Sequence, residues 1–350
     1  MSKYFYKDKP IIGLDISPTG LKVMAIDPKK QVVLGYGSLD VDPTKLQHSL
    51  DGDGNYLAEQ LKILINDKVV GRLPSNHTIM SIPTSRTFSR SLMLPGDVKG
   101  DLIDAIRLEA DQYIPISADQ LYIDYEVTSR SKDAITAYMC AAPQHIVDVC
   151  IDAAKRAGLR TVVVEPGMNA VARLLKISEQ GELPTVIVDI GAASTDVAVL
   201  DKTIKVTGGV AVGGNTFTLD IAAKLDVSQE QAHQLKVLDG LGPGKRQREI
   251  REAVEPNLTK IGSEVKKVMR YYNERVINAQ KVEQLVIIGG GSNMPAIGDY
   301  FTESLLLASR VASPWQVLNF GKLPQPARQF KTRYISAAGL ASVHAKEIWG

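Results

Sequence analysis

The most constraining feature of this 350-residue chain is an acidic β-hairpin that occurs twice. Thr185–Leu200 (TVIVDIGAASTDVAVL) has two runs of valine and isoleucine, typical of buried strands, on either side of a turn of small residues. Gly13–Asp27 (GLDISPTGLKVMAID) has the same order, and aligning Asp15 with Asp189 needs no gap. The copies lie 174 residues apart. Solenoid repeats have periods of ~20–50 residues, so this repeat predicts two similar domains rather than an array.

The turns of the two hairpins indicate phosphate chemistry. The small residues of Ser17–Gly20 and Gly191–Thr195 let backbone N–H groups come close to an anion. A carboxylate beside such a turn, here Asp15 or Asp189, cannot bind phosphate directly but can hold Mg²⁺ or a water that does. A third turn, Gly289–Asn293 (GGGSN), follows an apolar run and suits close backbone approach to a sugar or base. One such turn alone would be a plain strand–helix connection, but three predict a nucleotide site.

The remaining pattern alternates strands and helices, which predicts an α/β fold. We expect strands at Ile11–Ser17, Leu21–Asp27, Thr78–Pro83, Thr87–Leu94, Leu121–Thr128, Ala134–Ala142, Thr161–Glu165, Ile204–Val210 and Leu285–Ile288. We expect helices at Tyr56–Lys68, after the N-cap Asp101, at Pro143–Gly158, Met168–Ser178 and Thr216–Leu225, over most of Val227–Tyr272, and at Pro295–Leu307 and Ser336–Ile348. The polar stretch Glu179–Pro184 is the expected domain boundary.

Composition excludes several classes of function. The chain is 44% hydrophobic and 23% charged, as in soluble globular proteins, and its net charge of +2 gives no reason to expect nucleic-acid binding. No run approaches the ~18 apolar residues of a membrane span, and the N-terminus lacks the apolar region of a secretory signal, so we expect a cytoplasmic location. The five histidines have no metal-ligand spacing. Cys140 and Cys150 are expected to be buried, reduced thiols, with a disulfide left open.

Two further stretches have a functional and a plain interpretation. Gly240–Lys245 faintly resembles a phosphate-binding loop, but Arg246 replaces the Ser or Thr and a surface turn is expected. Lys260–Arg275 is a basic helix that could contact RNA, although its charges are better explained as a solvated face.

The three turns, in this order, resemble the actin-like ATPase superfamily, which implies two duplicated ribonuclease-H-like domains. Three stretches resemble the PilM family of type IV pilus assembly: Ala105–Ser117 (AIRLEADQYIPIS), Val163–Leu175 (VVEPGMNAVARLL) and Val212–Ala222 (VGGNTFTLDIA). The resemblance implies an inserted subdomain, 1C, of the kind found in FtsA and PilM. FtsA proteins usually continue into an amphipathic membrane-targeting helix, whereas this sequence ends at KEIWG, which favours the PilM family.

The resemblance also implies a division of the chain into four parts. Domain 1A would comprise 9–77, 143–182 and 326–350, with subdomain 1C at 78–142. Domain 2A would comprise 183–222 and 283–325, with the helical subdomain 2B at 223–282.

The resemblance implies ATP or ADP and Mg²⁺ as cofactors. Asp15 and Asp189 would hold the metal through water. The phosphates would be contacted by Ser17, Thr19 and Lys22 on one side and by Gly191, Ser194 and Thr195 on the other. The sugar and base would be bordered by Gly213, Gly214, Gly289, Gly290, Gly291 and Ser292, with Glu264 and Lys267 beside the adenosine.

Hydrolysis is expected to be weak or absent. The sequence has Ser17 where the family usually has glycine in the first phosphate turn, followed by Pro18. The turn still offers hydroxyl and amide groups, so nucleotide binding is expected to survive. The resemblance makes Glu165 and Asn169 the candidates for positioning an attacking water.

The family implies an adaptor at the inner face of the cytoplasmic membrane. It would bind the N-terminal cytoplasmic tail of PilN, link it to pilus motor ATPases, possess a capacity for self-association, and meet the membrane only through partner proteins. We expect the peptide groove in subdomain 1C, walled by Ile103, Ile106, Leu108 and Tyr113. The alternative for each residue is a place in the subdomain's own core. The alternative function is an FtsA-like division protein or a filament-forming actin homologue with ATPase activity.

Overall fold

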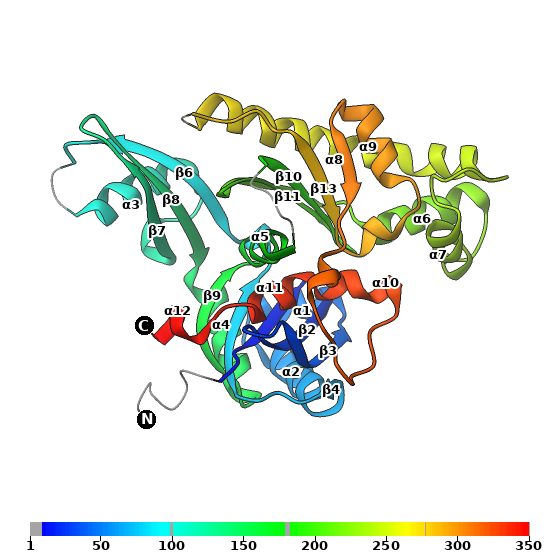
Figure 1. Ribbon diagram of the computed structural model, residues 1–350, viewed down its shortest axis with the longest axis horizontal. Helices are drawn as coiled ribbons and strands as arrows, with labels where there is room; N and C mark the ends of the chain where they lie inside the picture. Colours follow the sequence, from blue (N-terminus) through cyan, green and yellow to red (C-terminus); the bar gives the residue numbers. More distant parts are fainter. Residues whose placement is uncertain (1–8, 99–100, 179–182, 277, 350) are drawn as a thin grey trace. The chain divides into compact units, whose positions relative to one another are not determined.

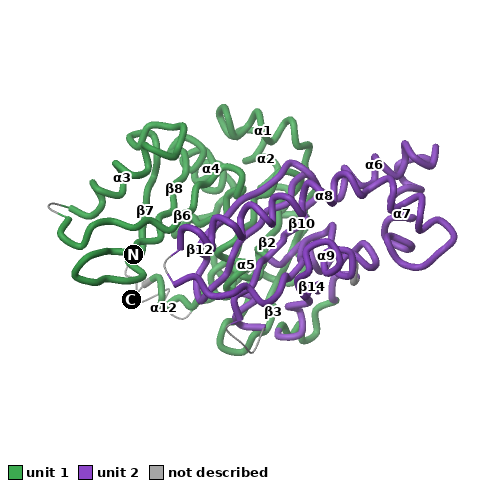
Figure 2. Tube along the Cα trace, turned by 90° about the horizontal axis from the view of Figure 1, so that it is seen from above, with its two compact units in different colours: residues 1–173, 318–324, 336–350 green, residues 174–317, 325–335 purple. Residues whose placement is uncertain are grey.

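The computed structural model describes residues 9–98, 101–178, 183–276 and 278–349 (Figure 1). The chain divides into two compact units (Figure 2). Unit 1 comprises Met1–Arg173, Leu318–Pro324 and Ser336–Gly350, and unit 2 comprises Leu174–Val317 and Gln325–Ile335. Residues 179–182 of the expected boundary lie outside the described ranges.

Unit 1 is built on a six-stranded sheet in the order β4-β3-β2-β1-β5-β9. Its strands are β1 (Ile12–Ser17), β2 (Gly20–Asp27), β3 (Val32–Asp40), β4 (Val69–Gly71), β5 (His77–Ile82) and β9 (Arg160–Pro166). β1 pairs antiparallel with β2, as the first hairpin predicted, and parallel with β5. β5 pairs parallel with β9. Strands β3 and β4 were not predicted from the sequence.

Helices pack on both faces of this sheet because its strands are apolar on both sides. One face is covered by α1 (Pro43–Asp51), α2 (Asn55–Asp67) and α4 (Gln144–Arg156), which contribute leucine, isoleucine and valine to a shared core. The other face meets α5 (Gly167–Ser178), α11 (Ile335–Ala341) and the segment leading into α12 (Ala345–Trp349). On that face a Cβ at Gly339 would lie 1.9 Å from the carbonyl oxygen of Ala170, so only glycine lets α11 approach α5 so closely.

Residues 88–143 of unit 1 form a small subdomain with its own core. The antiparallel strands β6 (Phe88–Pro95), β8 (Ala134–Pro143) and β7 (Leu121–Arg130) lie in that order, and the predicted pairing of the last two is confirmed. Helix α3 (Leu102–Tyr113) covers one face of this sheet (Figure 1). The side chain of Asp101 accepts the backbone N–H of Ile103 at 3.3 Å, which confirms the predicted N-cap.

Unit 2 repeats the plan of unit 1. Its strands lie in the order β14-β13-β10-β11-β12, with β10 (Thr185–Ile190), β11 (Thr195–Asp201), β12 (Thr203–Val210), β13 (Gln284–Ile288) and β14 (Ala308–Val311). The antiparallel β10-β11-β12 and the parallel β13 match β1-β2-β3 and β5, so the internal repeat is a structural duplication. Helices α6 (Gly214–Leu225), α7 (Gln229–Leu238), α8 (Gln247–Arg275) and α9 (Ile297–Leu305) share its core.

Two predicted helices are shorter or divided. The predicted single helix Ser336–Ile348 is wrong, because α11 ends at Ala341 and α12 begins at Ala345. Ser342 donates to the carbonyl of Ala338 at 2.7 Å and Val343 packs into the core. These contacts favour the break. Likewise α9 ends at Leu305, before the predicted Leu307, because Leu306 adopts a left-handed conformation.

The remaining short elements are η2 (Thr84–Arg86), η3 (Ala118–Gln120), η4 (Gly290–Asn293), η5 (Pro314–Val317), α10 (Arg328–Lys331) and η6 (Thr332–Tyr334).

Both cysteines are free thiols, and burial raises the pKa of Cys140 to about 11 and that of Cys150 to about 12. Cys150 is buried as predicted, whereas Cys140 is only half-buried. Across the described ranges, every helix is too short or too polar to span a bilayer.

Candidate functional site

The acidic hairpin of unit 1 holds a cluster of charged and hydroxyl groups. The β1–β2 register places Asp15 opposite Lys22, whose Nζ donates to Asp15 Oδ2 at 3.0 Å and also to Ser17 Oγ. Ser17 Oγ donates to the carbonyl of Gly20 at 2.9 Å, which closes the turn. Ser81 on the parallel strand β5 donates to Asp15 Oδ1 at 2.7 Å. Both oxygens of the buried Asp15 carboxylate are therefore bound, and the sequence analysis missed Ser81 because β5 is distant along the chain.

This environment fits an indirect role for Asp15 toward a metal. Each carboxylate oxygen has a second lone pair, so Asp15 can accept a hydrogen bond from a metal-bound water. A direct metal bond would have to displace Lys22 or Ser81. Within the described ranges, no three His, Cys, Asp or Glu side chains group as metal ligands. The donor set thus fits Mg²⁺ held through water, which is the manner that ion commonly prefers.

The acidic hairpin of unit 2 has a tighter turn. Asp189 is half-buried at the end of β10, and the N–H of Gly191 donates to the carbonyl of Ser194 at 2.9 Å. Thr195 is fully buried, and its hydroxyl donates to the carbonyl of Val212 at 2.7 Å. The Thr195 side chain therefore fastens the turn to the segment before α6.

Gly213 and Gly214 bring the first turn of α6 against this hairpin. The N–H of Gly214 donates to the carbonyl of Gly191 at 2.9 Å, and a Cβ at Gly213 would lie 2.6 Å from the carbonyl oxygen of Ala192. A side chain at Gly213 would push the helix away from the turn. As a result, the N-terminus of a 12-residue helix lies beside the acidic hairpin, and its dipole favours an anion there.

The glycine turn after β13 presses on the end of β10. Gly289 has φ 84°, and a Cβ there would lie 2.2 Å from Asp189 Oδ1. A Cβ at Gly291 would lie 2.2 Å from Cγ2 of Ile190. By contrast, a Cβ at Gly290 would meet no heavy atom within 4 Å in the part of the chain that the structure describes. Ser292 is buried, and its hydroxyl donates to the carbonyl of Gly289 at 2.7 Å, so Gly290 is the exposed member of the turn.

The structure adds Lys236, which the sequence analysis missed. Its ammonium group on α7 donates to the carbonyl of Gly214 and to Thr218 Oγ1, each at 2.7 Å. The residue is 7% exposed, and burial lowers the pKa of Lys236 to about 8. A signal was present in the sequence, because Lys236 lies four residues after the apolar Ala232 and therefore on the same, inward face of its helix.

Glu264 and Lys267 lie on α8 and pair with each other. Lys267 Nζ is 3.2 Å from Glu264 Oε2, and the lysine side chain is 76% exposed. Glu264 packs against β12, where a Cβ at Gly208 would lie 2.6 Å from Glu264 Oε1. Their place beside an adenosine remains a prediction.

Glu165, predicted to position water, is held in an ion pair. Its two carboxylate oxygens accept from the two terminal nitrogens of Arg173, each at 2.8 Å. Arg173 also donates to the carbonyl of Gly339 at 3.0 Å, which ties α5 to α11. Asn169 is half-buried on α5. The pair gives Glu165 a structural explanation, and the catalytic assignment of Glu165 and Asn169 remains a prediction.

The four predicted groove residues do not share one surface. Ile106 is fully buried in the core of the small subdomain and Ile103 is half-buried. Leu108 is 67% exposed, because it lies two residues from Ile106 and hence about half a turn around α3. Tyr113 is 51% exposed and lies under the guanidinium of Arg90, 3.7 Å from the ring centroid. Only Leu108 and Tyr113 are thus available to a partner.

A duplicated sheet with one acidic hairpin in each unit, and a glycine turn after β13, defines an actin-like ATPase fold. Solved structures confirm this class. A chain of the PilM-PilN type IV pilus biogenesis complex has 20% identity and a TM-score of 0.78, covering 95% of this chain and 98% of that one. The ethanolamine utilization protein EutJ of Carboxydothermus hydrogenoformans has 16% identity and a TM-score of 0.53, and ADP-bound MreB5 of Spiroplasma citri has 14% and 0.50. Each covers 95% of this chain, with 88% of the EutJ chain and 95% of the MreB5 chain matched.

The family model for the type IV pilus assembly protein PilM matches residues 13–344. The chain therefore belongs to the PilM family. Curated relatives include the cell division protein FtsA of Borreliella burgdorferi, 20% identical over 94% of this chain and 73% of that protein. FtsA of Pseudomonas aeruginosa is 25% identical over 64% of this chain and 60% of that protein.

Proposed function

We propose that the protein is an ATP-binding adaptor of a type IV pilus assembly platform. It binds the N-terminal cytoplasmic tail of PilN and links the platform to motor ATPases at the inner face of the cytoplasmic membrane. The observation that carries the proposal is the PilM family match over residues 13–344. Similarity to a chain of a solved PilM-PilN complex over nearly the whole length of both chains supports the partner.

The nucleotide proposal rests on the groups that each unit offers to an anion. In unit 1, Lys22 brings a positive charge to a turn with the hydroxyls of Ser17 and Thr19. In unit 2, the dipole at the start of α6 favours an anion, the exposed Gly290 offers backbone, and Lys236 adds a cation bound to Gly214. A protein of the same fold, MreB5, has been solved with ADP.

We assign roles to these residues as part of the proposal. Lys22, Ser17, Thr19 and the turn residues Gly191 and Ser194 contact phosphate, while Thr195 keeps that turn in shape. Gly213, Gly214, Gly289, Gly290, Gly291 and Ser292 border the sugar and base, with Glu264 and Lys267 beside the adenosine. Asp15 and Asp189 hold Mg²⁺ through water, and the ion would neutralise phosphate charge there.

Substitution of Gly290 tests nucleotide binding with little risk to the fold. Gly290→Leu adds a side chain where the described structure leaves open space and no positive φ is required. We expect ADP affinity, measured by isothermal titration calorimetry, to fall at least ~tenfold, because the leucine occupies the ligand's place. Gly244→Leu is the matched control, since a Cβ there also meets no described heavy atom within 4 Å. Unchanged ADP affinity in Gly290→Leu would contradict the site.

We propose that ATP acts on the adaptor as a stabilising ligand and is hydrolysed weakly or not at all. Single-turnover phosphate release should then not exceed the background of Asp189→Ala. Release clearly above that background would favour an ATPase that drives pilus dynamics.

The peptide partner is tested with a labelled peptide that carries an Asn-Leu-Leu-Pro-like core. We expect micromolar affinity by fluorescence anisotropy in the presence of ATP, as is usual for short linear motifs. Tyr113→Ala and Leu108→Ser remove the two exposed apolar side chains of α3 and should weaken binding. Leu238→Ser, which changes a 75% exposed leucine in unit 2, should not. Absence of binding to the unaltered protein would refute the adaptor.

An FtsA-like or filament-forming function is the second candidate. The observation in its favour is the match to an FtsA protein over 94% of this chain. Sedimentation with ATP and Mg²⁺ separates the two: pelleted polymer would favour the filament former, and a monomer or dimer the adaptor.

A further inference from the structure

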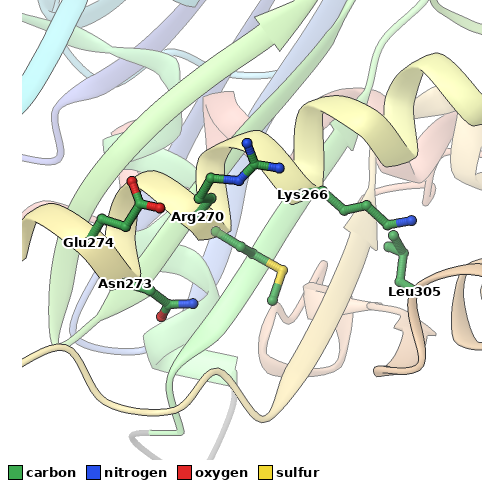
Figure 3. A pocket seen from close by; sticks show the side chains of 6 residues that line it. Lys266, Arg270, Asn273, Glu274 and Leu305 are labelled. Atoms are coloured by element: carbon green, nitrogen blue, oxygen red, sulfur yellow. The ribbon is translucent and has the colours of Figure 1, made fainter.

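An open groove runs along the exposed face of α8 in unit 2 (Figure 3). Its volume is about 360 Å³, and it is lined by Lys266, Met269, Arg270, Asn273, Glu274 and Leu305. Figure 3 shows the labelled side chains of α8 extending from a single helix, with Leu305 contributed by the end of α9. None of its six lining residues is among those assigned to nucleotide or PilN.

The groove begins where the covering of α8 by α9 ends. A Cβ at Gly262 would lie 3.7 Å from Cδ2 of Leu305, so Leu305 packs directly over that glycine. Lys266 follows one turn later and lines the open groove, together with Met269, Arg270 and Asn273. The opposite face of this part of α8 packs in the core through Val265, Val268 and Tyr272, each no more than 3% exposed. The groove thus has a rigid wall.

Two cations flank the apolar centre of the groove. Lys266 and Arg270 are exposed and four residues apart, which puts them on one side of the helix. Neither forms an ion pair with any residue that the structure describes. Met269 lies between them in sequence and brings a flexible apolar side chain, a type common at surfaces that adapt to partners. The arrangement complements a ligand that combines negative charge with an apolar group.

Leu306, beside the groove, is unusual for an exposed position. It is 91% exposed, and its φ of 54° lies in the left-handed region that glycine or asparagine adopts at less cost at a helix end. A leucine here neither buries apolar area nor eases the turn. Its side chain gains a physical role only if a partner covers it.

We propose that the groove and Leu306 form a docking surface for an acidic segment of a partner protein with a large apolar residue. The apolar residue occupies the space between Met269 and Leu305 and covers Leu306. The acidic groups of the segment pair with Lys266 and Arg270, and Asn273 offers a hydrogen bond at the far end. Glu274 lies beyond the cations and disfavours a uniformly anionic surface such as a lipid bilayer or a nucleic acid.

The test uses the full chain and a random twelve-residue peptide phage library, with enriched peptides remade with a fluorescein label. Selected peptides should be acidic with at least one leucine, phenylalanine, methionine or tryptophan. Lys266→Glu/Arg270→Glu should weaken anisotropy-measured binding at least ~tenfold, because the acidic peptide would then face two carboxylates in the groove. Leu306→Asn should weaken it several-fold while easing the backbone, so a loss there cannot come from unfolding.

The matched control is Lys245→Glu/Arg246→Glu, which makes the same change of charge at two exposed residues before α8. Lys266 follows 20 residues after Arg246, a rise of about 30 Å along a helix. Equal weakening in this control would show a net-charge effect and overturn the proposal. Failure to enrich acidic peptides would overturn it too, as would binding that survives both groove variants. Binding of phosphatidylglycerol vesicles that the groove variants abolish would assign the surface to lipid, and loss of self-association in sedimentation would assign it to a second copy.

Discussion

A buried ammonium group makes Lys236 the most informative position to perturb. Its Nζ donates to the carbonyl of Gly214 and the hydroxyl of Thr218, and burial lowers the pKa of Lys236 from 10.5 to about 8. The unfolded chain then binds more protons than the folded one between about pH 8 and 10.5, so folding stability should rise with pH across that window. A difference of 2.5 pKa units corresponds to about 3 kcal/mol of unfolding free energy. Because of this group, the folded state is less stable by that amount below pH 8 than above pH 10.5.

The assay follows the lysine directly. The protein is labelled with ¹³C-lysine, and the Lys236 signal is identified by its absence from Lys236→Met. Its pH titration should have a midpoint of about 8, well below the ordinary lysine value of 10.5. The Met variant also removes the pH dependence due to this group, so the difference in unfolding free energy between the two proteins should change by up to about 3 kcal/mol from pH 7.5 to 10.5.

Nucleotide provides the second half of the test. A phosphate group close to the α6 N-terminus would favour the charged lysine, so saturating ADP should raise the midpoint. A midpoint near 10 without nucleotide would refute the argument from burial. A midpoint of about 8 that ADP does not move would leave burial intact and place the phosphates away from Lys236.

Two further predictions concern packing and ion-pair contacts of α5 in unit 1. Gly339→Ala should lower the melting temperature measured by calorimetry, with a loss of at least ~2 kcal/mol, because the new methyl group would overlap the carbonyl of Ala170. Gly244→Ala should leave it unchanged, and equal effects of the two would contradict the close-contact argument. Glu165→Gln should cost about 2 kcal/mol by leaving Arg173 without its ion pair. An altered rate of phosphate release at unchanged stability would instead support the water-positioning role.

The sequence alone determined the duplication, because strand periodicity and turn chemistry are local properties of each hairpin. The hydrophobic positions of Gly13–Asp27 and Thr185–Leu200 match without a gap, and both became antiparallel pairs in equivalent sheets. The glycine turn was equally visible, since only glycine permits the φ of 84° at Gly289. Family membership followed from longer stretches such as Ala105–Ser117.

Tertiary structure decided which polar groups meet. Ser81 reaches Asp15 only because β5 pairs in parallel with β1, 66 residues away along the chain. Periodicity places Lys236 on an inward face but cannot say that Gly214 and Thr218 lie there to receive it. The same limit applies to the predicted peptide wall, where Ile106 fills the core and Leu108 faces solvent according to what the sheet beneath α3 covers. Local pattern specifies each element, but long-range packing fixes its neighbours, and the chemistry of the candidate site depends on those neighbours.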